Sequence, residues 1–144
     1  MRSLTICIVL TLSAGALACP RGLQRRDAAQ VLADHRAALA AGNVPLAMCD
    51  FDDDAVVIHD GGVDTGKAAI FASLSFLNAL FGATNPDVIE EVDVSVLNEH
   101  TEMARVLWSL RLPFGTIPDG VDTYIIRHGK IQAQTAHGFL VFGP

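Results

Sequence analysis

The chain has 144 residues, of which 51% are hydrophobic, and 16 acidic and 10 basic side chains give it a formal net charge of −6. This length suits one domain with one hydrophobic core. The acidic balance argues against nucleic acids and anionic membrane surfaces as partners.

The first 18 residues have the pattern of a secretory signal peptide. Arg2 supplies a positive charge, residues 4–17 are apolar apart from Thr and Ser, and Ala16-Leu17-Ala18 forms the small-x-small motif of a cleavage site. The apolar run is too short for a comfortable membrane span. We therefore predict a secreted or periplasmic protein, and a buried N-terminal helix is the alternative.

Two cysteines, Cys19 and Cys49, follow the predicted signal peptide. Cys19 directly follows the cleavage motif, as the lipid-bearing cysteine of a bacterial lipoprotein does, but Leu17 is one residue late for that motif. Lipidation at Cys19, with membrane attachment, is therefore kept as an alternative. Because residues 19–26 are predicted to form a flexible leader, we favour Cys49 as a small buried hydrophobic residue over a Cys19–Cys49 disulfide.

The first half of the mature chain predicts mainly helices. The expected elements are a helix at 27–41, a short helix at 44–50, a strand at 55–59 and a third helix at 67–81. Asp27 is a suitable N-cap, and Gly42 and Asn43 can end the first helix. Apolar residues and His35 recur on one face of this helix at helical spacing.

The second half has the period-two pattern of strands. The expected strands are residues 88–97, 103–114, 121–127 and 130–141, with loops at 82–87 and 115–120. Helices followed by an antiparallel meander predict an α+β fold, with about three helices packed on a curved antiparallel sheet.

Four segments carry a resemblance to a known superfamily: AALAAGN, FDDDAV, TGKAAI and DTYIIRHGKI. In this order they resemble the NTF2-like superfamily, in its SnoaL-like and ketosteroid-isomerase-like branches. The resemblance implies one SnoaL-like domain over residues 27–144, with an NTF2-like cone around one deep pocket. It also implies a homodimer formed through the sheet. Each segment marks the fold more than an activity.

Three positions of the ketosteroid isomerases have counterparts here. In that family, a helical tyrosine and a protonated aspartate donate to an oxyanion, while an aspartate at the end of the first strand moves the proton. These positions fall on His35, Asp122 and His59, so the resemblance implies His59 as the base and Asp122 and His35 as polarising donors. Only Asp122 keeps the family residue, so steroid isomerisation is not implied.

Other roles for the same residues remain open. His35 could be a satisfied core histidine, His59 could bond the turn that follows it, and Asp122 could pair with either histidine. A two-His, one-carboxylate metal site from these three is a further alternative, but no HxH or HxxxH spacing supports it. We predict no metal and no cofactor.

The substrate-binding candidates are Phe51, Phe71, Trp108, Tyr124 and His137. Trp108 and Tyr124 each need a hydrogen-bond partner if buried. His137 lies on the last predicted strand, and the sequence leaves open which face it is on. We predict a pocket for a small hydrophobic molecule, with proton-transfer chemistry of isomerase, cyclase or dehydratase type. A non-catalytic binding or carrier protein and a structural role through the dimer face are the alternatives.

Overall fold

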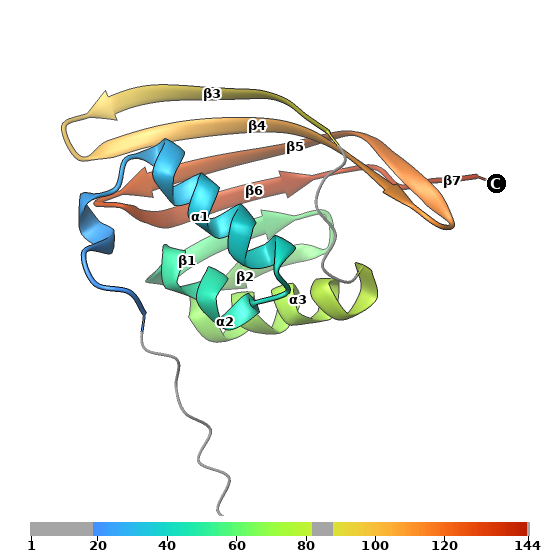
Figure 1. Ribbon diagram of the computed structural model, residues 1–144, viewed down its shortest axis with the longest axis horizontal. Coiled ribbons are helices and arrows are strands. Elements are labelled where there is room, and N and C mark those ends of the chain that lie inside the picture. Colours follow the sequence, from blue (N-terminus) through green and yellow to red (C-terminus); the bar gives the residue numbers. More distant parts are fainter. Residues whose placement is uncertain (1–18, 82–87, 144) are drawn as a thin grey trace, which may run out of the picture.

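The structure is a computed structural model that describes residues 19–81 and 88–143. Within these ranges, three α-helices pack against a curved, unclosed sheet of seven strands (Figure 1). The helices are α1 (Ala28–Ala40), α2 (Val44–Ala47) and α3 (Gly66–Phe81). The strands are β1 (Phe51–His59), β2 (Gly62–Thr65), β3 (Val88–Asn98), β4 (Thr101–Leu112), β5 (Gly115–Arg127), β6 (Lys130–His137) and β7 (Val141–Phe142). This arrangement confirms the predicted α+β, NTF2-like cone.

The sheet is mixed, with strand order β2-β1-β6-β5-β4-β3 and with β7 paired to β5. β1 and β6 run parallel, whereas the sequence predicts an antiparallel sheet throughout. A parallel pair needs a long connection, and here the chain between β1 and β6 supplies it. In Figure 1, α1 lies across the inner face of the sheet and α3 lies against β1 and β2.

The predicted ends of the first helix are confirmed. The Asp27 side chain accepts a hydrogen bond from the Gln30 amide at 2.8 Å, and the Gln30 side chain accepts from the Asp27 amide at 3.2 Å. This reciprocal capping box satisfies two amides that the helix leaves free. Gly42 follows the helix with a φ of 67°, the left-handed conformation that favours glycine.

The predicted loop at residues 115–120 is wrong, because these residues form the first part of β5. Pro118 has no amide hydrogen for a ladder and so appeared to exclude a strand. In the structure it lies in an irregularity of the β4–β5 ladder, between the pairs Leu110–Ile117 and Trp108–Gly120. The predicted loop at 82–87 lies outside the described residues.

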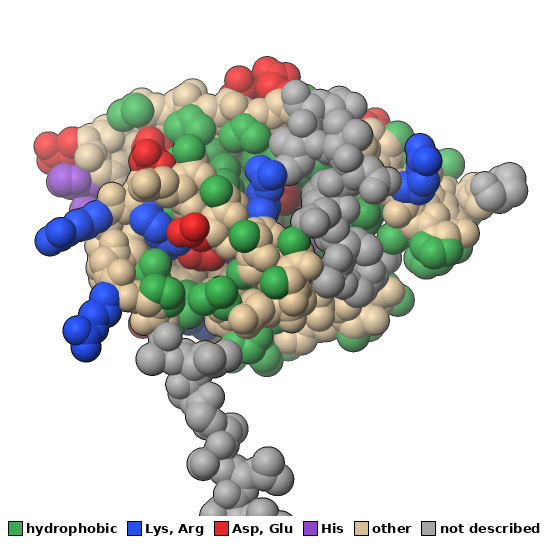
Figure 2. All heavy atoms as spheres, viewed as in Figure 1, with side chains coloured by type: hydrophobic (Ala, Val, Ile, Leu, Met, Phe, Trp, Pro, Cys, Tyr) green, Lys and Arg blue, Asp and Glu red, His purple; other side chains and the backbone are tan. Residues whose placement is uncertain are grey.

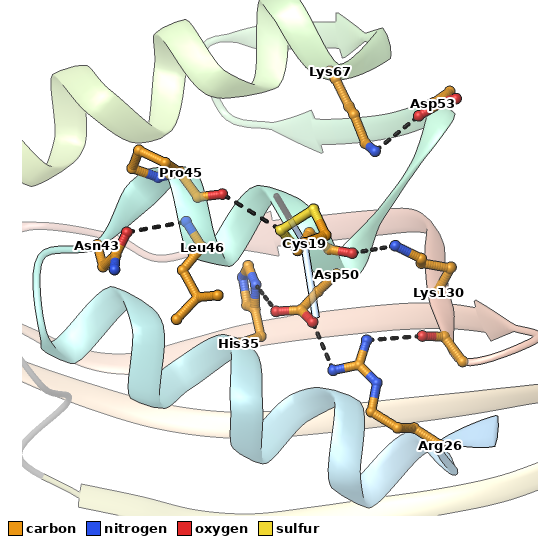
Figure 3. Close-up of a disulfide and its surroundings, with 12 residues drawn as sticks. Cys19, Arg26, His35, Asn43, Pro45, Leu46, Asp50, Asp53, Lys67 and Lys130 are labelled. Atoms are coloured by element: carbon orange, nitrogen blue, oxygen red, sulfur yellow. Dashed lines mark hydrogen bonds and ion pairs between the residues drawn. A yellow bond between two sulfur atoms is a disulfide. The ribbon is translucent and has the colours of Figure 1, made fainter. Parts of the chain in front are cut away.

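The expectation that Cys49 is a free buried residue is also wrong. Cys19 and Cys49 form a disulfide with a Cα–Cα distance of 5.4 Å (Figure 3). The same sulfur cannot also carry a lipid thioether, so the bonded state excludes lipidation of Cys19. Residues 19–26 are thus attached at one end by this bond and at the other by Arg26, which donates to Asp50 and to the Gly129 carbonyl.

The hydrophobic core lies between α1 and the inner face of the sheet. Its largest fully buried apolar side chains are Val31, Leu32, Phe51, Ile70, Ile126 and Ile131. On the face drawn in Figure 2, which is the view of Figure 1, acidic and basic side chains are scattered among hydrophobic ones.

Candidate functional site

A cavity of about 700 Å³ lies between α3 and the ends of β1, β4, β5 and β6. Its apolar walls include Val57, Ile70, Leu74, Leu77, Leu110 and Ile117. Its polar lining comprises Ser73, Trp108 and Gln134 together with two histidine–aspartate pairs. Pockets of this size, with mostly apolar walls and a few polar groups, are typical of sites for small organic molecules.

Asp122 is the centre of a polar cluster at the wall of this cavity. Its Oδ1 accepts from Trp108 Nε1 at 3.0 Å, and its Oδ2 accepts from the Tyr124 hydroxyl at 2.9 Å and from Gln134 Nε2 at 3.2 Å. Gln134 Nε2 also donates to the Tyr124 oxygen at 3.2 Å. Trp108 and Tyr124 therefore find the hydrogen-bond partner that their burial was predicted to require.

Strand register brings this cluster together. Asp122 and Tyr124 are two residues apart on β5 and so share a face, and Tyr124 pairs with Gln134 on β6. Trp108 on β4 pairs with Gly120, where an added Cβ would lie 2.3 Å from the indole ring. Glycine at position 120 therefore gives the indole the space from which it reaches Asp122.

Burial raises the pKa of the Asp122 carboxyl, although hydrogen bonds from Trp108, Tyr124 and Gln134 favour its ionised form. Burial also raises the pKa of Tyr124 well above its ordinary value, and the neighbouring Asp122 charge adds to this shift. Asp122 is consequently the group of this cluster that takes up a proton as the pH falls, while Tyr124 stays protonated.

Asp122→Asn tests this pKa shift through stability. A raised native pKa means that the stabilising contribution of Asp122 is fully present below the unfolded pKa and is lost as pH rises through the native pKa. As the pH rises from about 3.5 to about 7, the wild-type protein should therefore lose stability relative to Asp122→Asn. The loss should be about 1.4 kcal/mol per unit of difference between the native and unfolded pKa of Asp122. Urea unfolding of both proteins across this range measures the difference, and a pH-independent difference would contradict the shift.

Two histidine–aspartate pairs lie at the rim of the cavity. His59 Nε2 is 3.3 Å from Asp64 Oδ2, and His59 Nδ1 accepts from the Gly61 amide at 3.1 Å. His137 Nδ1 is 2.6 Å from Asp60 Oδ1. The hydrogen bonds from His137 and from the Gly138 amide lower the pKa of Asp60, so this carboxylate is ionised at neutral pH.

His35 lies elsewhere, on the buried face of α1 (Figure 3). Its Nδ1 is 3.5 Å from Asp50 Oδ2, and its ring meets Phe51 edge-on at a centroid distance of 5.2 Å. At 3.5 Å the contact is an ion-pair distance without hydrogen-bond geometry, so Nδ1 has no hydrogen-bond partner among the described residues. Arg26 completes this buried group by donating to Asp50 Oδ1 at 2.7 Å.

The three predicted catalytic residues therefore have separate partners. His35 contacts Asp50, His59 contacts Asp64, and Asp122 bonds Trp108, Tyr124 and Gln134. His59 lines the cavity, and Asp122 bonds two residues that line it. Their catalytic roles stay a prediction.

Only some of the five predicted binding residues lie at the cavity. Trp108 and His137 line the cavity, and Tyr124 lies in the polar cluster bonded to that wall. Phe51 is fully buried in the core beside His35, and Phe71 is 43% exposed on α3. Neither phenylalanine is among the described residues that line the cavity.

Four polar residues that line the cavity were missed from the sequence: Asp60, Asp64, Ser73 and Gln134. The turn DGG after His59 contains Asp60, which was assigned only a turn role. Gln134 shares a face with Ala136, but its place opposite Tyr124 depends on the β5–β6 register, which the sequence does not display.

In the ranges that the structure describes, no three His, Cys, Asp or Glu side chains are grouped so that they could hold a metal ion. The alternative metal set of His35, His59 and Asp122 is not formed there. None of the described helices is long and apolar enough to cross a membrane.

No family model and no curated protein sequence matches this chain. Solved structures do match it. An NTF-2-like protein of unknown function from Shewanella oneidensis is 18% identical, with 76% of this chain and 94% of that one covered and a TM-score of 0.62. An NTF-2-like protein of unknown function from Burkholderia xenovorans is 20% identical, with 85% of this chain and 87% of that one covered and a TM-score of 0.58. A ketosteroid isomerase-like protein from Erwinia carotovora is 11% identical, with 81% of this chain and 94% of that one covered and a TM-score of 0.62. At these identities the likeness concerns the fold.

Proposed function

This chain has the NTF2-like fold, and from that premise we propose that it binds a small, largely apolar organic molecule in the cavity beside α3. The observation that carries the proposal is the cavity of about 700 Å³, whose walls are mostly aliphatic and whose polar groups are few. Burying such a molecule against these walls supplies the favourable free energy of binding.

The pairing of the polar groups favours binding over catalysis by His35, His59 and Asp122 acting together. The Trp108, Tyr124 and Gln134 donors are directed to Asp122 or to one another, and His35 contacts Asp50 in the core. Such a satisfied cluster provides a rigid polar wall that orients a ligand. Proton-transfer catalysis is the second candidate, and the two histidines at the cavity rim are the observation that favours it.

A fluorescent apolar probe tests the binding proposal. We expect N-phenyl-1-naphthylamine to bind saturably at one site per chain, with increased emission. Ala72 lies on α3 and lines the cavity, so Ala72→Trp should occupy the ligand space and weaken binding about 10-fold or more, equivalent to at least about 1.4 kcal/mol. Fluorescence titration of both proteins gives the two dissociation constants.

Ala68→Trp is the matched control. Ala68 lies one helical turn earlier on α3, is exposed like Ala72, and is not among the described residues that line the cavity. A tryptophan there leans towards the helix N-terminus, away from position 72, and should leave affinity unchanged. Absence of saturable binding by wild type, or equal affinity in Ala72→Trp, would overturn the proposal.

Export and self-association are part of the same proposal. The Cys19–Cys49 bond supports export, because disulfides persist in oxidising compartments. The exposed valines Val92, Val94 and Val96 on β3, an edge strand, support a homodimer formed through the sheet. Sedimentation equilibrium measures this association, and a monomer at all accessible concentrations would exclude it.

A further inference from the structure

The two histidines at the cavity rim differ in which ring nitrogen is free. His59 accepts the Gly61 amide hydrogen at Nδ1, so in neutral His59 the ring proton is on Nε2 and is directed to Asp64. Both nitrogens are thereby engaged. A base needs an unshared electron pair, and His59 has none to offer in this arrangement.

His137 has the opposite arrangement. Asp60 is an ionised carboxylate that can only accept, so the hydrogen between Asp60 Oδ1 and His137 Nδ1 belongs to the histidine. In neutral His137 the electron pair is therefore on Nε2. No group among residues 19–81 and 88–143 bonds to that nitrogen.

We propose that His137 and Asp60 form a proton-abstracting dyad at the rim of the cavity, with His137 Nε2 as the general base toward a small, largely apolar substrate. A carboxylate that holds the Nδ1 hydrogen fixes the tautomer and stabilises the imidazolium formed when Nε2 takes a proton. Asp60 is the positioning residue. The inference rests on the proposed ligand-binding function and adds a reaction to it.

The position of the dyad suits this role. Both residues line the cavity, and Asp60 lies in the β1–β2 turn while His137 ends β6, so rigid strands hold them. The Gly138 amide is 3.4 Å from Asp60 Oδ2 and helps to orient the carboxylate. The His137 side chain is 64% exposed, which gives the abstracted proton a route to water.

The elimination of 5-nitrobenzisoxazole reports a general base beside an apolar cavity. His137 Nε2 would take the proton from C3, the C3–H electron pair would complete a nitrile, and the N–O bond would break to give a phenolate. His137 would then return its proton to water. The phenolate is coloured, so absorbance gives kcat and KM for the full, disulfide-bonded chain.

We expect wild type to accelerate this reaction over buffer and His137→Ala to lower kcat/KM by about 100-fold. Added imidazole should restore part of the rate to His137→Ala, because the exposed rim admits it. Asp60→Asn should lower kcat with KM unchanged, since the asparagine amide can donate to Nδ1 and favour the wrong tautomer. Ala68→Trp, which changes a residue outside the described cavity lining, should keep the wild-type rate.

Probe binding separates the two proposals. Each variant should bind N-phenyl-1-naphthylamine as wild type does. A lower rate then reports loss of the general base and not loss of ligand binding. If wild type binds the probe but does not accelerate the elimination, or if His137→Ala keeps its rate, the dyad is overturned and the binding function stands. If wild type does not bind the probe, the binding function fails, and the dyad proposal fails with it.

Discussion

Replacing Arg26 with methionine is expected to destabilise the protein by about 3–5 kcal/mol, because it leaves a buried carboxylate without its cation. Arg26 donates to Asp50 Oδ1 at 2.7 Å, and the Asp50 side chain is only 5% exposed. Urea unfolding at neutral pH measures the loss. Burial lowers the pKa of Lys130, and the nearby Asp50 charge opposes this shift. The Lys130 ammonium, which donates to the Cys49 carbonyl, is thus a second cation near Asp50 and favours the lower end of this range.

Arg25→Met is the matched control, because Arg25 is exposed and ends the short 3₁₀ turn at Leu23–Arg25. It should change stability by no more than about 0.5 kcal/mol. Adding Asp50→Asn to Arg26→Met should recover part of the loss, since the uncompensated charge disappears. Equal stabilities of Arg26→Met and Arg25→Met would contradict the assignment of Arg26 to a buried ion pair.

Removing the disulfide should cause the second large loss of folding stability. Cys19→Ser opens a bond between residues separated by 30 positions, and the chain-entropy model gives a loss of about 3–4 kcal/mol for a loop of this length. Cys19 is exposed, so the substitution creates no cavity and leaves the buried Cys49 thiol in place. Thermal or urea unfolding, with and without dithiothreitol, measures the difference.

Wild type and Cys19→Ser should become equally stable in the reducing agent, because neither then carries the bond. The variant itself should not respond to dithiothreitol. A variant as stable as oxidised wild type would mean that the bond contributes nothing. The disulfide is also one of the points at which sequence analysis was wrong, since it favoured Cys49 as an unpaired buried residue.

The order of elements was predictable because its causes are local. Asp27 followed by Gln30 forms a capping box, Gly42 takes the left-handed conformation that ends α1, and the alternation after residue 88 predicts strands. These signals depend on neighbours in the chain, so the sequence displays them directly. The strand at residues 115–120 was not predicted, because Pro118 is tolerated there only through an irregularity in the pairing of β5 with β4.

The candidate site was predictable only in part. The need of Trp108 and Tyr124 for hydrogen-bond partners follows from their chemistry, and the position of Asp122 follows from the resemblance. That both bond this one carboxylate depends on the register of β4 against β5, in which Trp108 lies opposite Gly120.

The sequence by itself determined most of the order of helices and strands and the α+β fold that they form. Tertiary structure alone decided which polar groups meet: Cys19 with Cys49, His35 with Asp50, and His137 with Asp60. Local propensities arise from residues a few positions apart, whereas each of these contacts depends on the packing of segments distant in the chain. The free electron pair of a histidine depends in turn on that partner, so the tautomer at the cavity rim could be derived only from the folded protein.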